Sequence, residues 1–190
     1  MKFRLLYEGP IAPRQKIGLP DVHAIRKSLH PQLYSLWQFL PLAAEVSKVL
    51  LRHEDASDNQ IGIIETRGNT LFTPIVTKRL DLMCELDITF LRKQAPGQLI
   101  GEGGDIDNRV KTLLDALSVP PFSQQDFFRD KGDLDHPVHC LLQDDSLVTR
   151  LSVETDRLLR PTTGEHDLVA IIQVKVTASR LSFANIGIVN

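Results

Sequence analysis

The sequence predicts an α+β fold in a single domain, with a mixed, mostly antiparallel sheet packed against a few helices. Residues 80–90 and 168–176 alternate between apolar and polar side chains, which is typical of strands with one buried face. Residues 107–117 instead carry apolar side chains at three- and four-residue steps, which is typical of an amphipathic helix. A chain of 190 residues suits one domain with a substantial core.

Further strands are predicted along the chain from shorter patterns, at residues 2–8, 61–66, 70–77 and 147–153. The segments 61–66 and 70–77 are joined by Arg67-Gly68-Asn69, which predicts a hairpin. No internal repeat and no second domain is visible.

Two longer segments separate these strands. The region 21–52 is predicted to be helical, with Asp21 as its N-cap and interruptions near Pro31 and Pro41. Residues 118–140 are rich in Pro, Phe, Asp and Gln and have no sustained periodicity, so we interpret them as an inserted loop.

The composition is that of an ordinary soluble protein, with 42% hydrophobic and 24% charged residues. No apolar run approaches the roughly 20 residues of a membrane span. The two cysteines, Cys84 and Cys140, form no disulfide framework, so we expect a reducing, cytoplasmic setting. Residues 1–52 have eight basic and three acidic side chains, a net charge of +5, which leaves −7 for the remainder of a chain whose net charge is −2. This asymmetry fits phosphate contacts beside a metal site, and it equally fits an ordinary surface.

The most informative stretch starts at Gly103 and continues into the helix that ends near Leu117. Asp105 and Asp107 lie at or before the first turn, where free N–H groups favour negative charge. Asp107, Lys111 and Asp115 are four residues apart and therefore share one helical face.

This pattern alone also fits a well-capped surface helix. A second acid pair, Asp144-Asp145, stands just before the strand at 147–153. Two carboxylate clusters, each at the start of a regular element, are what a divalent-metal site needs. An EF-hand beginning at Asp105 is excluded, because Val110 stands where its glycine is required.

The string from Asp105 to Leu117, followed by Asp144-Asp145, resembles the RusA family of Holliday junction resolvases. The family pattern is Asp-x-Asp-Asn-x-x-Lys-x-x-x-Asp-Ala-Leu, then an Asp-Asp pair entering a strand. The resemblance implies a homodimeric endonuclease that depends on Mg²⁺, with Mn²⁺ as a substitute, and that cuts branched DNA.

The resemblance also implies roles for individual residues of this chain. Asp105, Asp107 and Asp145 match the metal-binding catalytic acids, Lys111 matches the catalytic lysine, and Asp144 matches a secondary acid. The chain departs from the family in its longer segments at 21–52 and 118–140, which we interpret as insertions in a single RusA-like domain spanning residues 1–190.

Arg14 and Lys16 end a proline-stiffened loop and are predicted nucleic-acid contacts, as is Arg109 in the helix. For the loop, a solvated connector is the alternative. For the whole protein, two alternatives remain open: a metal-dependent nuclease for other structured or single-stranded nucleic acid, and a catalytically silent nucleic-acid-binding or assembly protein on the same scaffold.

Overall fold

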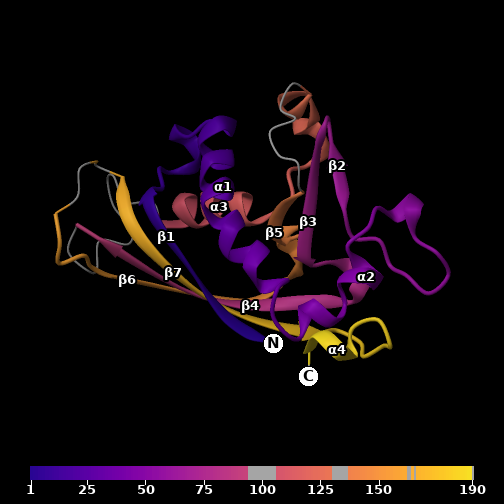
Figure 1. Cartoon of the computed structure of the whole chain (residues 1–190). Coiled ribbons are helices and arrows are strands. Elements are labelled where there is room, and N and C mark those ends of the chain that lie inside the picture. The colour runs from indigo at the N-terminus through magenta and orange to yellow at the C-terminus, as the bar shows by residue number, and fades with distance from the viewer. Residues whose placement is uncertain (94–105, 130–136, 162–163, 165, 190) are drawn as a thin grey trace.

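The computed structural model describes residues 1–93, 106–129, 137–161, 164 and 166–189 (Figure 1). A four-stranded sheet has the order β1-β7-β4-β6. Its strands are β1 (Lys2–Pro10), β4 (Leu82–Arg92), β6 (Val148–Arg157) and β7 (Asp167–Ala178). β7 pairs antiparallel with β1 and with β4, whereas β4 and β6 are parallel. The predicted mixed, mostly antiparallel sheet is therefore confirmed.

A second sheet has three strands in the order β2-β3-β5, namely β2 (Glu65–Arg67), β3 (Thr70–Val76) and β5 (Val138–Leu142). β2 and β3 form the predicted hairpin, and Gly68 takes the left-handed conformation at its turn with φ of 55°. β2 is much shorter than predicted, because the N–H groups of Ile61, Ile63 and Ile64 bond to carbonyls of residues 48, 49 and 51 instead of to a strand.

β5 corrects the interpretation of residues 118–140 as a loop. A short 3-10 helix, η5 (Phe122–Phe128), occupies the first part, and β5 begins at Val138. All five residues of β5 are buried, and the strand pairs parallel with β3. A strand buried on both faces shows no alternation, so the period-two pattern that predicted the other strands was absent here.

The helices are α1 (Leu19–Leu36), α2 (Val46–Val49), α3 (Ile106–Leu117) and α4 (Ile186–Val189). α1 begins two residues before Asp21, whose carboxylate accepts a hydrogen bond from the N–H of Gly18 at 3.1 Å. Pro31 does not interrupt α1, contrary to the prediction. Burial of Leu29 and Leu33 on either side of it stabilises the continuous helix. The predicted break near Pro41 is confirmed, since α1 ends at Leu36.

α1 and α3 lie on the same face of the four-stranded sheet, and the main core is between them and the strands (Figure 1). Its fully buried members include Leu29, Leu33, Leu86, Phe90, Leu113 and Ile172. Cys84 belongs to this core, and burial raises the pKa of its thiol to about 12. The single-domain α+β fold is thus confirmed. In the described part of the chain, no helix combines the length and apolar character needed to cross a membrane.

Candidate metal and nucleic-acid site

The amphipathic pattern of α3 is confirmed in the structure. Val110, Leu113 and Leu117 are buried, whereas Asp107 and Lys111 are exposed and follow one another by one helical turn. Neither exposed side chain makes a hydrogen bond or ion pair to another described residue. α3 therefore presents a carboxylate and an ammonium group to solvent while its opposite side anchors it in the core. Asp105, the other acid of the motif, lies outside the described residues.

A second side of α3 binds the loop that follows β1 through a hydrogen bond and an ion pair. The hydroxyl of Thr112 donates to the carbonyl of Ala12 at 3.0 Å, and it also bonds to the carbonyl of Asn108 at 2.9 Å. One turn later, the carboxylate of Asp115 lies 2.7 Å from Nε of Arg14. Successive turns of α3 thus position the loop that carries Arg14 and Lys16.

Arg109 belongs to the same set of contacts, and its position corrects the prediction that it contacts nucleic acid. Its side chain is only 3% exposed. Nη1 donates to the carbonyl of Ile11, and Nη2 lies 3.4 Å from Nδ1 of His166. A buried guanidinium that bonds a backbone carbonyl stabilises the loop, so a phosphate is not its partner here.

The C-terminal half of α3 borders a pocket of about 410 Å³. The acids that line it are Asp115 from α3 and the pair Asp144 and Asp145, which precede β6. Arg14 lies on the same wall as Asp115 and is itself about one-third exposed. The pocket therefore brings together the second predicted acid cluster and one of the predicted phosphate-contacting residues. Lys16 lies outside it, exposed at the end of the 3-10 helix η1 (Arg14–Lys16).

Two buried arginines that the sequence did not point to, Arg26 and Arg67, also line this pocket. Arg26 of α1 donates to the carbonyls of Ser118 at 3.1 Å and Asp115 at 2.6 Å, which are orphan groups at the end of α3. Arg67 of β2 donates to the carbonyl of Pro120 at 2.6 Å and lies over the ring of Phe122, with its Cζ 3.8 Å from the centroid. The position of Arg26 within the apolar stripe of α1 was the only available signal.

Asp144 and Asp145 differ in their surroundings. Asp144 caps the 3-10 helix η6 (Asp145–Leu147), where its carboxylate accepts bonds from the hydroxyl and, at 3.0 Å, from the N–H of Ser146. The hydroxyl and then the N–H of Ser146 hold the pKa of Asp144 below its ordinary value. Asp145 is exposed, and its carboxylate bonds to no described residue. Asp144 therefore caps η6, whereas the exposed carboxylate of Asp145 has no partner among the described residues.

The structure does not bring Asp107 and Asp145 together within one chain. Asp145 shares the pocket with Asp115 and Ser118, at the C-terminal end of α3, whereas Asp107 is in the first turn. Eight residues of helix place Asp107 about 12 Å from Asp115 along the axis. Within the described ranges, no group of three or more His, Cys, Asp and Glu side chains is placed to hold a metal ion.

No family model, curated protein or solved structure matches this chain.

Proposed function

We propose that this protein is a magnesium-dependent endodeoxyribonuclease that cuts branched DNA as a homodimer. The observation that supports the proposal most directly is the exposed face of α3, where Asp107 and Lys111 stand one turn apart without partners among the described residues. The resemblance of the surrounding motif to the RusA family indicates the substrate class. A surface built only to bind DNA gains nothing from unpaired carboxylates that face its phosphates.

The donor chemistry of the exposed acids fits Mg²⁺, with Mn²⁺ as a substitute. Mg²⁺ prefers oxygen ligands, keeps several waters and needs only one or two carboxylates in addition to substrate phosphate. Asp105, Asp107 and Asp145 are the residues proposed to hold it. A bound Mg²⁺ would lower the pKa of a coordinated water and offset the charge that develops on the scissile phosphate. Lys111 is proposed to stabilise that same charge as a point cation.

The separation of Asp107 and Asp145 along α3 bears on how the proposed dimer would form its metal sites. If both acids serve one metal ion, a two-fold-related copy must supply one of them, because they lie toward opposite ends of α3 in a single chain. Two such sites would arise in a symmetric dimer, which is also what paired cuts in a four-way junction require.

Arg14 is the proposed phosphate contact nearest to Asp145, and Lys16 is the second on the same loop. The ion pair between Arg14 and Asp115 is half-exposed and therefore exchangeable. Both cysteines are buried and free, which supports the proposed cytoplasmic setting.

A nicking assay on a four-way junction, a flap and a linear duplex tests the proposal, with Mg²⁺, with Mn²⁺ and with a chelator. We expect symmetric paired cuts in the junction that require the metal ion. Cutting of flaps or single strands in preference to junctions would assign the chemistry to another substrate. Tight binding without cutting of any substrate would overturn the proposed enzyme and leave a nucleic-acid-binding protein.

A further inference from the structure

β6 forms an open edge of the four-stranded sheet. Within the part of the chain that the structure describes, its ten residues pair with β4 on one side and with no strand on the other. An edge strand presents a row of N–H and C=O groups that can pair with another chain. Leu151 in the middle of β6 is 42% exposed, although it lies on the same sheet face as the core residue Leu86, with which it is in register.

The opposite edge of the same sheet is different. The side-chain amide of Gln32, from α1, donates to the carbonyl of Leu6 at 2.7 Å and accepts from its N–H at 2.9 Å. These two bonds occupy backbone groups in the middle of β1, so a strand added there would have to displace Gln32. β6 has no such cover among the described residues, which makes it the edge that is ready for pairing.

We propose that β6 pairs antiparallel with β6 of a second copy, about a two-fold axis at Ser152. Two sheets of four strands would thereby become one continuous sheet. This inference rests on the proposed function only in taking the protein to be a homodimer. It adds the surface through which the two copies meet.

The side chains of β6 are self-complementary in this register. Residues directly opposite one another in an antiparallel pair lie on the same face of the sheet. With Ser152 opposite its own copy, Arg150 faces the partner's Glu154 on the outer face. Leu151 faces the partner's Val153 on the inner face. Each pair occurs twice because of the symmetry.

Neighbouring registers lack this combination. An axis at Leu151 would place Arg150 opposite Ser152 and remove the ionic pair. An axis at Val153 would place Arg150 opposite Asp156, but it would set Leu151 against a threonine. The axis at Ser152 is therefore preferred over both, since it satisfies charge and apolar contact together.

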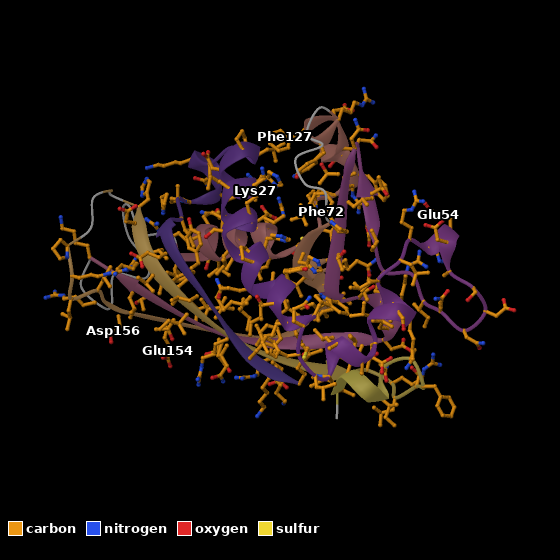
Figure 2. All side chains as sticks on the ribbon, in the orientation of Figure 1. Lys27, Glu54, Phe72, Phe127, Glu154 and Asp156 are labelled. Atoms are coloured by element: carbon orange, nitrogen blue, oxygen red, sulfur yellow. The ribbon has the colours of Figure 1, made fainter. Side chains whose placement is uncertain are left out.

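Arg150 lies on the outer face of the sheet, where its guanidinium is held against β4. Its Nε lies 3.1 Å from a carboxylate oxygen of Glu85, and its Nη2 lies 2.8 Å from one of Asp87. These bonds fix the guanidinium over the outer face and leave Nη1 outside them. Figure 2 shows Glu154 and Asp156 projecting from β6 on the side of the sheet away from α1 and α3, which is the face that Arg150 shares.

Disulfide trapping of a Ser152→Cys variant tests the register. Opposite residues in an antiparallel pair have Cα atoms about 4.5–5.5 Å apart, which a disulfide can bridge. The matched control is Glu154→Cys, whose two copies would be offset by four residues, about 13 Å, which is too far for a disulfide. Cys84 and Cys140 should not interfere, because both are buried and burial raises the pKa of each thiol to about 12.

We expect oxidised Ser152→Cys to migrate as a covalent dimer while Glu154→Cys stays monomeric on a denaturing gel. Equal trapping of both variants, trapping of the control alone, or a native mass that stays monomeric would overturn the inference. Circular dichroism of the reduced variants confirms that both are folded.

A second measurement does not depend on disulfide chemistry. Glu154→Lys places a cation opposite Arg150 at two symmetric positions and should weaken the dimer by about tenfold in its dissociation constant. Asp156→Lys, which faces Val148 in this register, should leave the constant unchanged. If Asp156→Lys weakened the dimer and Glu154→Lys left its dissociation constant unchanged, the register would instead have its axis at Val153.

The two proposals fail separately. If the protein cuts junctions but Ser152→Cys forms no covalent dimer, the proposed interface is overturned and the proposed nuclease activity stands. If Ser152→Cys forms a covalent dimer but the wild type cuts no DNA, the proposed interface stands and the proposed nuclease activity is overturned.

Discussion

Nε of Arg14 lies 2.7 Å from the carboxylate of Asp115, and this ion pair joins the loop after β1 to the last turns of α3. Both residues line the pocket that Asp145 also lines. Asp115 therefore bears on the proposed DNA binding in two ways. It orients Arg14, and it adds negative charge near the phosphates that Arg14 is proposed to contact.

Replacing Asp115 with Asn removes the negative charge and the ion pair with Arg14 together. We expect the free energy of unfolding to fall by less than about 1 kcal/mol, because both partners of the ion pair are more than one-third exposed. DNA affinity should rise, since a negative charge is removed beside the phosphates. Chemical denaturation and fluorescence anisotropy with labelled junction DNA measure the two quantities.

Asp126→Asn is the matched control, because Asp126 forms a similar exposed ion pair with Arg129, at 2.9 Å. Asp126→Asn should lower the free energy of unfolding as little as Asp115→Asn does, and it should leave DNA affinity unaltered. Equal gains in affinity from both variants would show that the effect reflects overall charge and not the pocket at the end of α3.

The sequence predicted α3 and its exposed face well because the information is local. The stripe of Val110, Leu113 and Leu117 requires one side of the helix to be buried, and this leaves Asp107 and Lys111 outside. The strands with one buried and one half-buried face, such as β4 and β7, were found for the same reason. Their alternating pattern records which face is covered.

The parts that were not predicted depend on contacts between distant segments. β5 is buried on both faces, so its sequence does not alternate. Arg26 was missed because its partners are carbonyls at the end of α3, which no side-chain pattern reveals. The burial of Arg109 was not predicted because it depends on the loop after β1, whose Ile11 carbonyl accepts a bond from the guanidinium. The separation of Asp107 from Asp145 follows from the length and direction of α3, which residue spacing alone does not fix.

Asp145→Asn should abolish metal-dependent cutting and leave the metal-free protein equally stable or more stable. The carboxylate of Asp145 bonds to no described residue, so its loss removes no native contact among them. Asn keeps the shape but is a poorer ligand for Mg²⁺. Asp58→Asn, in an exposed loop after α2, is the control for removal of a surface carboxylate. Thermal unfolding and the nicking assay are the readouts. A variant that unfolds would make Asp145 structural and remove it from the site.

Asp144 should make the stability of the protein depend on acidic pH. The two bonds from Ser146 lower the pKa of Asp144 in the folded state below its ordinary value of 3.8. The folded protein therefore favours the ionised form, and this contribution to stability is fully present about one pH unit or more above 3.8. It is lost as the pH falls through the folded pKa. The difference in unfolding free energy between the wild type and Asp144→Asn should be constant from neutral pH down to about 5 and shrink at lower pH.

The comparison of Asp144→Asn with Ser146→Ala checks the cause of this dependence. Without Ser146 the hydroxyl bond to the carboxylate is removed, so the pH-dependent part of the stability should shrink while Asp144 itself remains. A full pH dependence in Ser146→Ala would assign it to another carboxylate.

Arg109→Met should destabilise the fold without weakening the contacts of folded protein with DNA. The guanidinium is 3% exposed and donates to the carbonyl of Ile11, so its removal leaves that carbonyl without its donor. We expect a loss of about 1–3 kcal/mol of unfolding free energy, which is the usual cost of an unsatisfied buried polar group. Arg14→Gln is the matched control: it should change stability little and should reduce the slope of log affinity against log salt by about 0.9 for one lost phosphate contact. Both slopes are measured by anisotropy well below the unfolding temperature. A reduced slope in Arg109→Met with unchanged stability would reverse the assignment and return Arg109 to the DNA-binding surface.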